Sequence, residues 1–187
     1  MRAAPSVADT TAIALGANLG DPAATLAAVR PLLGAVVGSA RCHWSPLFHT
    51  EPVGGPTSQP TYCNAVLLLG PPLPPLPPHT LLQHLQALEL RFGRQRQQRW
   101  GPRHLDLDLL WCGSMRIETA ALQLPHPRLL ERSFVLAPLA AIAPDLVPPG
   151  QPPGMPGLSC SILLKQLLPR LPEAPPLQLP ASVNWPA

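Results

Sequence analysis

The stretch LDLDLLW, residues 105–111, begins with alternating apolar and acidic side chains, the period of a β-strand whose two faces meet different surroundings. In such a strand the leucines face a core, whereas Asp106 and Asp108 share the opposite face, with their backbones roughly 6.5–7 Å apart. Aspartate is disfavoured in strands, and two carboxylates on one face repel each other. The stretch therefore predicts a strand that carries an acidic, functional face.

The segments around this strand predict the fold. A helix with a buried leucine stripe is expected over 80–92, and an earlier helix starts with Asp21 as its cap and Pro22 at its first position. The order β-α-β-β-α-β is typical of a ferredoxin-like α+β sandwich, a fold that does not by itself name a function. The predicted strands cover residues 11–16, 42–48, 62–69 and 105–111. An additional C-terminal strand and helices are expected over 121–124, 128–130, 134–142 and 158–168.

The chain divides into three parts by composition. Residues 1–10 form an N-terminal extension, residues 11–170 form one domain, and residues 171–187 form a proline-rich tail that we expect to be poorly ordered. Within the domain, PPLPPLPP at residues 71–78 is unsuited to a helix or a central strand. We expect it to be a stiff polyproline II connection, although such a segment also suits an SH3-type ligand.

Composition limits the class of protein. Apolar residues make up 46% of the chain and charged residues 12%, and no apolar run approaches the roughly 20 residues of a membrane helix, so no membrane partner is expected. Asp9 interrupts the N-terminal apolar stretch, which argues against a secretory signal. The four cysteines are scattered without a C-x-x-C pair. This pattern favours free thiols in a reducing compartment and hence a cytoplasmic location.

Basic residues gather just before the acidic strand. Five of the 13 basic residues fall within 91–103, which predicts an anionic ligand. Asp106 and Asp108 beside these arginines suit a Mg²⁺–nucleotide site, because Mg²⁺ prefers carboxylate oxygens and arginine binds phosphate. The alternative is a non-catalytic nucleic-acid or protein-interaction module that uses the arginines and PPLPPLPP. The acidic strand lacks the aromatic residues with which RNA-binding sheets stack bases, so no nucleic-acid partner is expected.

Several separated segments resemble, in the same order, the motifs of one enzyme family. The strongest is RWGPRHLDLDLL at residues 99–110, which resembles the signature of the 6-hydroxymethyl-7,8-dihydropterin pyrophosphokinases. The resemblance extends over residues 11–147. The other segments are IALGANLGD (13–21), HTEPVG (49–54), QPTYCNAV (59–66), ELRFGRQRQQRWGPR (89–103) and LPHPRLLERSFVLAPL (124–139).

The resemblance implies a reaction and its cofactors. Members of the family transfer the β,γ-pyrophosphate of ATP to the hydroxymethyl group of a dihydropterin in folate synthesis and release AMP. This implies ATP as co-substrate, the pterin as acceptor, and two Mg²⁺ ions held by Asp106 and Asp108. We expect a monomer, and neighbouring enzymes of folate synthesis are partners that the sequence leaves open. Residues 93–101 are expected to close over the nucleotide as a lid.

The resemblance also assigns residues to roles. Catalysis is implied for Arg94, Arg103, Asp106 and Asp108. ATP binding is implied for Gln86, Glu89, Arg96, Arg99, Trp100, Arg103, His126 and Arg132. Pterin binding is implied for Thr50, Pro52, Val53, Tyr62, Asn64 and Phe134. Three positions, Glu51, Ala121 and Pro127, depart from the common pattern and bear on affinity rather than on the reaction.

Overall fold

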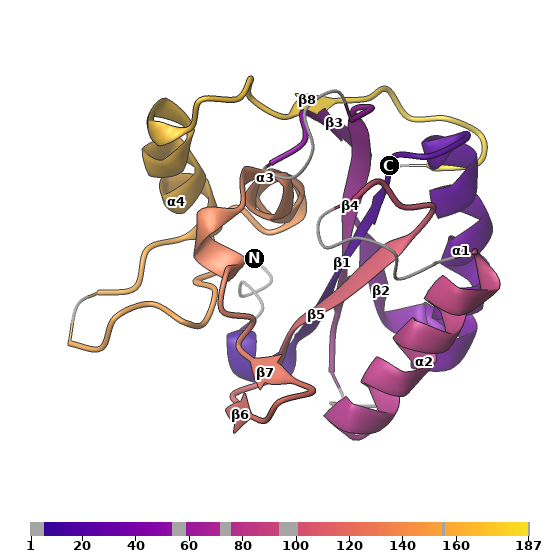
Figure 1. Cartoon of the computed structure of the whole chain (residues 1–187). Coiled ribbons are helices and arrows are strands. Elements are labelled where there is room, and N and C mark those ends of the chain that lie inside the picture. The colour runs from indigo at the N-terminus through magenta and orange to yellow at the C-terminus, as the bar shows by residue number, and fades with distance from the viewer. Residues whose placement is uncertain (1–5, 54–58, 72–75, 94–100, 155, 187) are drawn as a thin grey trace.

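The computed structural model describes residues 6–53, 59–71, 76–93, 101–154 and 156–186 (Figure 1). Its centre is an antiparallel sheet with the strand order β5-β1-β4-β3-β8, in which β2 also pairs with β4. The strands of this sheet are β1 (Thr11–Ala17), β2 (Cys42–Trp44), β3 (Phe48–Thr50), β4 (Tyr62–Leu69), β5 (Asp106–Cys112) and β8 (Leu177–Gln178).

The connections between the strands are those of a ferredoxin-like fold, which confirms the predicted fold class. α1 (Pro22–Val37) joins β1 to β2, and α2 (Pro78–Arg91) joins β4 to β5. Because β1 and β3 both pair antiparallel with β4, they run parallel to each other. Likewise, β4 and β5 both pair antiparallel with β1. Each crossover helix therefore connects two parallel strands that have one antiparallel strand between them.

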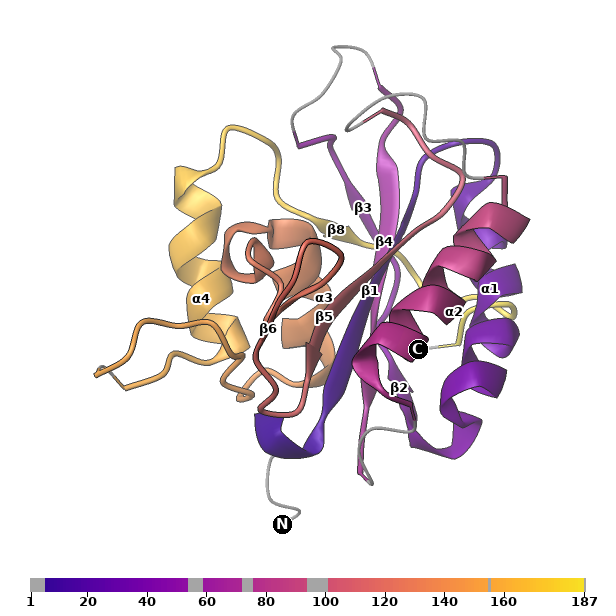
Figure 2. The ribbon, with the colours of Figure 1, turned by 60° about the horizontal axis from the view of Figure 1, so that its bottom comes forward.

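Helices cover both faces of the sheet (Figure 2). On one face, α1 and α2 bury Leu26 and Leu85 in a cluster that includes Leu107 of β5. On the other face lie α3 (Ser133–Ile142) and α4 (Cys160–Leu167), and Val135 of α3 packs in a cluster with Val66 of β4. A small hairpin of β6 (Ile117–Glu118) and β7 (Gln123–Leu124) follows β5. Within the described ranges, no helix is long and apolar enough to cross a membrane.

Local sequence signals set the starts of both crossover helices. Asp21 Oδ1 accepts a hydrogen bond from the amide of Ala24 at 3.0 Å, and Pro22 is the first helical residue, as predicted. α2 begins at Pro78, two residues before the predicted start, because the fixed φ of proline suits the first turn. Residues 72–75 of the expected polyproline connection and residues 94–100 of the expected lid lie outside the described residues.

The single strand predicted over 42–48 is in fact two strands, β2 and β3, separated by a bulge. Trp44 lies opposite Leu67 and Phe48 opposite Asn64, so three residues of one chain segment face two of β4. Ser45 exchanges two hydrogen bonds of 2.9 Å with the Val66 backbone, one of them through its Oγ. The following residue is a proline, which has no amide hydrogen for a strand ladder.

The tail after Arg170, which was expected to be poorly ordered, packs against the domain instead. β8 pairs with β3, and Trp185 is 2% exposed with its indole Nε1 donating to the Ser45 carbonyl at 2.8 Å. The Arg30 guanidinium lies over the rings of Trp44 and Trp185, 5.2 and 4.9 Å from their centroids. Burial of a tryptophan offsets the conformational entropy that is lost when the tail becomes ordered. That loss is small, because a proline-rich segment has little conformational freedom to lose.

Candidate functional site

β5 places its two carboxylates on one face of the sheet. Leu107 and Leu109 are buried at 4% and 3% exposure, whereas the side chains of Asp106 and Asp108 are 24% and 32% exposed. The alternation predicted from the sequence is therefore confirmed. Both aspartates line a cavity of about 250 Å³.

This cavity gathers residues from separated parts of the chain. It receives side chains from β1, from β3 and the residues after it, from β4 and β5, and from the start of α3. The predicted site residues that line it are Thr50, Pro52, Val53, Tyr62, Asn64, Arg103, Asp106, Asp108, Arg132 and Phe134. Its other lining residues, which sequence reasoning did not assign to the site, are Ala14, Leu15, Gly16, Glu51, Arg128 and Glu131.

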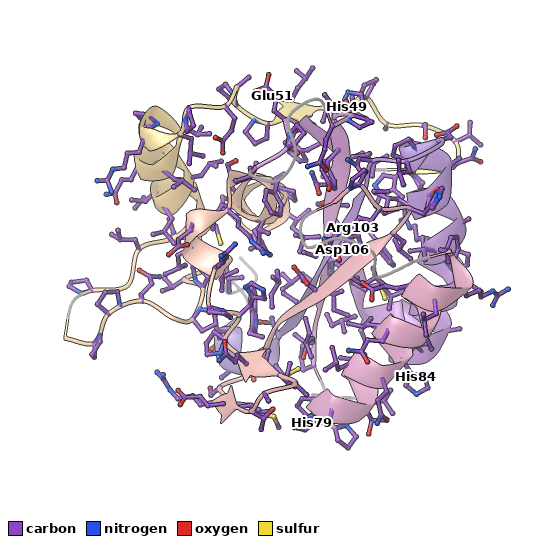
Figure 3. The ribbon with its side chains drawn as sticks, viewed as in Figure 1. His49, Glu51, His79, His84, Arg103 and Asp106 are labelled. Carbon is purple, nitrogen blue, oxygen red and sulfur yellow. The ribbon has the colours of Figure 1, made fainter. Side chains whose placement is uncertain are left out.

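Arginines neutralise both aspartates that line the cavity. Arg103 Nη1 donates to Asp106 Oδ1 at 2.7 Å, and the two side chains lie together near the start of β5 (Figure 3). Arg132 Nη1 donates to Asp108 Oδ2 at the same distance of 2.7 Å. Burial alone would lower the pKa of Arg103, but the charge and hydrogen bond of Asp106 outweigh it and raise that pKa. The site therefore keeps fixed positive charges beside its acids.

His126 lies at the edge of the same cluster. Its Nε2 is 3.9 Å from Asp108 Oδ2, and its Nδ1 accepts a hydrogen bond from the Arg128 amide at 3.1 Å. Burial lowers the pKa of His126; Asp108 opposes this shift, and Arg132 and Arg128 add to it. The neutral imidazole thus presents an N–H toward the side of the site where the acids lie.

Aromatic and amide groups line the same cavity. Asn64 is 5% exposed, and its Nδ2 donates to Thr50 Oγ1 at 2.6 Å, which fixes the orientation of the amide. Tyr62 and Phe134 line the cavity from β4 and α3, and the Arg132 guanidinium lies 5.4 Å from the centroid of the Phe134 ring. Flat rings and an oriented amide suit a planar ligand with donors and acceptors on its edge.

Gly16 is a cavity residue that sequence reasoning missed. A Cβ at this position of β1 would lie 2.8 Å from Asn64 Oδ1 and 3.9 Å from Tyr62. The residue therefore has to be glycine for Asn64 to keep its place. A glycine inside a strand often marks such a close approach. Its presence in the strand predicted over 11–16 therefore indicated this contact.

The other predicted site residues either lie away from the cavity or fall outside the described residues. Gln86, on α2, is half-buried, and Glu89 is 2% exposed with its Oε1 accepting a hydrogen bond from the Leu107 amide at 2.7 Å. Neither residue lines the cavity. Arg94, Arg96, Arg99 and Trp100 lie outside the described residues.

The pair Asp106 and Asp108 has the donor chemistry for Mg²⁺. Among the described residues, no group of three or more His, Cys, Asp or Glu side chains is placed to hold a metal ion. Mg²⁺ does not need such a group, because proteins commonly hold it by one or two carboxylates together with water and phosphate oxygens. Two half-exposed carboxylates on one strand face, with arginines beside them for the phosphates, fit that pattern.

The family model and two relatives that match this chain carry the name of one kind of enzyme. The family model described as 7,8-dihydro-6-hydroxymethylpterin-pyrophosphokinase matches residues 12–144. A relative from Pseudomonas aeruginosa, named 2-amino-4-hydroxy-6-hydroxymethyldihydropteridine pyrophosphokinase, is 42% identical over 134 residues, which cover 72% of this chain and 80% of the relative. A relative of the same name from Synechocystis is also 42% identical, over 137 residues that cover 73% of this chain and 68% of the relative.

The solved structures that resemble this chain are larger proteins. A Plasmodium falciparum HPPK-DHPS with pteroate matches with a TM-score of 0.60 and 11% identity, covering 87% of this chain and 43% of the solved chain. An HPPK-DHPS in complex with substrates matches with a TM-score of 0.61, 10% identity and the same 87% coverage of this chain, but 44% of its own. This chain thus spans less than half of these proteins, and at such low identity the likeness shows the fold alone.

Proposed function

The chain belongs to the 7,8-dihydro-6-hydroxymethylpterin-pyrophosphokinase family, and we propose that it transfers the β,γ-pyrophosphoryl group of ATP to 6-hydroxymethyl-7,8-dihydropterin, leaving AMP. It is an enzyme of folate synthesis of the transferase class, with ATP as co-substrate. One observation supports this reaction most directly: a single cavity is lined by aromatic and amide groups and by both carboxylate–arginine pairs.

The aromatic and amide residues of the cavity suit the pterin ring. We assign Tyr62 and Phe134 to its two faces, since both line the cavity and aromatic side chains bind flat rings by stacking. Asn64 reads the donors and acceptors of the ring edge, and its bond to Thr50 fixes which way its amide points. Pro52 and Val53 close the cavity beside Thr50.

The carboxylates and arginines of the cavity suit the triphosphate. Asp106 and Asp108 would hold Mg²⁺, two ions in our proposal, which neutralises phosphate charge when bound. Arg103 and Arg132 stand 2.7 Å from these carboxylates and can turn their remaining N–H groups to phosphate oxygens. Fixed cations in a partly buried site stabilise the charge that develops on the transferring group without reorganisation. The roles of Arg94, Arg96, Arg99, Trp100, Gln86 and His126 around the nucleotide remain part of the proposal.

The reaction is tested by product analysis. The protein is incubated with Mg·ATP and 6-hydroxymethyl-7,8-dihydropterin, and nucleotides are separated over time. AMP formed in equal amount to pterin diphosphate, and only when the pterin is present, is the expected result. ADP would mean single phosphoryl transfer, and absence of any turnover would favour the non-catalytic module. Sedimentation of the protein used in this assay tests the proposed monomer, and fractionation of the source cells tests the proposed cytoplasmic location.

Removal of either aromatic side chain should weaken pterin binding selectively. Tyr62→Ala and Phe134→Ala are each expected to cost about 1–3 kcal/mol of pterin affinity, the worth of stacking a base on an aromatic ring. The affinity for a non-hydrolysable ATP analogue should change little. Calorimetry with each ligand measures both, and Tyr62→Phe, which keeps the ring, is the control. Equal losses for the two ligands would mark these side chains as structural.

A methyl group at position 16 should also weaken pterin binding. Gly16→Ala places a Cβ 2.8 Å from Asn64 Oδ1, so Asn64 must shift away from Thr50 or the strand must move. We expect a weaker affinity for the pterin, measured as a rise in its KM, because overpacking of this kind costs about 1–3 kcal/mol and displaces the amide that binds the ring. The control is Gly70→Ala, where nothing lies within 4 Å of the added Cβ. An unchanged pterin KM in Gly16→Ala, with the side-chain amide signals of Asn64 shifted, would show that Asn64 does not bind the pterin.

A further inference from the structure

Glu89 is a buried acid that the cavity does not use. It lies in the last turns of α2 at 2% exposure, and its Oε1 accepts a hydrogen bond of 2.7 Å from the amide of Leu107. Leu107 stands in β5 between Asp106 and Asp108. Burying a carboxylate costs free energy unless it is well hydrogen-bonded. A buried glutamate at this position therefore needs a structural or functional reason.

The sheet explains why the Leu107 amide needs a partner. β5 is the terminal strand of the sheet order and pairs with β1, where Leu107 lies opposite Leu15. In an antiparallel ladder alternate residues direct their amides outward, and on a terminal strand these amides have no strand to meet. The carboxylate of Glu89 meets the Leu107 amide from the neighbouring helix. Such charge-assisted bonds are shorter and stronger than bonds between neutral groups.

This bond meets β5 midway between the two cavity acids. The Cα atoms of Asp106 and Asp108 are each one residue from that of Leu107, about 3.8 Å away, so a shift of Leu107 moves both aspartates together. The Leu107 side chain is itself buried against the cluster that includes Leu85 and Leu88 of α2. Helix and strand are thus joined by apolar packing and by a directed hydrogen bond at the point between the two acids.

We propose that Glu89 is a positioning residue that holds the Asp106–Asp108 segment of β5 in register with α2, instead of contacting the nucleotide as the family resemblance implies. The consequence for catalysis rests on the proposed pyrophosphokinase activity. The bond to Leu107 and its effect on the strand are properties of the free protein. A displacement of the acids by about 1 Å is enough to cost on the order of 10²-fold in rate.

The test compares Glu89→Ala, which removes the acceptor, with Glu89→Gln, which keeps a neutral one. Hydrogen exchange and the amide proton shift of Leu107 are followed by NMR in the ligand-free protein. The kcat and the affinity for an ATP analogue are then measured at saturating Mg²⁺. His84→Ala, at an exposed position of the same helix, is the control.

Glu89→Ala should speed exchange of the Leu107 amide and lower kcat by about 10–100-fold, with analogue affinity changed less than about threefold. Glu89→Gln should move the Leu107 amide proton upfield and cost kcat less than Glu89→Ala. An unmoved Leu107 resonance in Glu89→Gln overturns the proposal even if Glu89→Ala does not fold. A tenfold loss of analogue affinity with unchanged Leu107 exchange also overturns it and makes Glu89 a nucleotide contact. Turnover by the unaltered protein tests the proposed function separately.

Discussion

Asp106→Asn and Asp108→Asn should each lower kcat by about 10²–10³-fold or more, the cost of losing one fixed electrostatic group from a transition state. An amide keeps the shape of the side chain but lacks the charge that Mg²⁺ prefers. Stability should change little. Both carboxylates are 24–32% exposed, and an ion pair of that exposure with Arg103 or Arg132 is worth at most about 1 kcal/mol.

Steady-state kinetics over a range of Mg²⁺ concentrations measures this effect, and thermal unfolding measures stability. The matched control is Glu118→Gln, which neutralises an exposed acid on β6. Near-normal kcat in either aspartate variant at saturating Mg²⁺ would show that the carboxylate pair does not hold the metal. A large drop in stability would instead mean that the acids act mainly through their arginine partners.

Features decided by neighbouring residues could be predicted from the sequence. The alternation around Asp106 and Asp108 sets which side chains of β5 face the core, because the period of a strand is fixed by its backbone. The start of α1 depends on Asp21 and Pro22, which act within one turn. The order of such elements was sufficient for the ferredoxin-like fold, since crossover rules leave few topologies for it.

Features decided by residues far apart in the chain could not be predicted from the sequence. The bulge that separates β2 from β3 depends on Ser45 bonding to Val66, and the tail is held by Trp185 bonding to that same Ser45, 140 residues away in sequence. Composition alone favoured disorder for a segment so rich in proline. The tail is ordered because one tryptophan is buried and contacts Arg30, and no local sequence pattern predicts either feature.

The candidate site falls between these cases. The aspartates and the nearby arginines formed a recognisable pattern, whereas Tyr62 and Phe134 became candidates only through the family resemblance. For Glu89 the structure shows a contact that the family resemblance does not indicate. It lies next to Leu88 on the buried side of α2, and an acid on the buried stripe of a helix must have a local partner, here the Leu107 amide.

Arg103→Lys should lower kcat by about 10²–10³-fold although it keeps the positive charge. The backbone of Arg103 is fixed by Asn18, whose Oδ1 accepts from the Arg103 backbone amide at 2.8 Å and whose backbone amide donates to the Arg103 carbonyl at 3.0 Å. From this anchored position the guanidinium bonds Asp106 through one nitrogen and the Gly101 carbonyl through another. The group can therefore hold the acid and still direct N–H groups toward phosphate oxygens.

Lysine offers one compact ammonium in place of a planar fork, so it can serve the acid or the phosphates but not both in one geometry. We expect the kcat of Arg103→Lys to exceed that of Arg103→Ala by less than about tenfold. Single-turnover kinetics separates this loss in the chemical step from changes in binding, and Arg116→Lys, an exposed position, is the control. If Arg103→Lys were as active as the unaltered enzyme, a point charge would suffice at this position. Arg103 would then act through its field on Asp106 rather than through directed bonds to the transferring group.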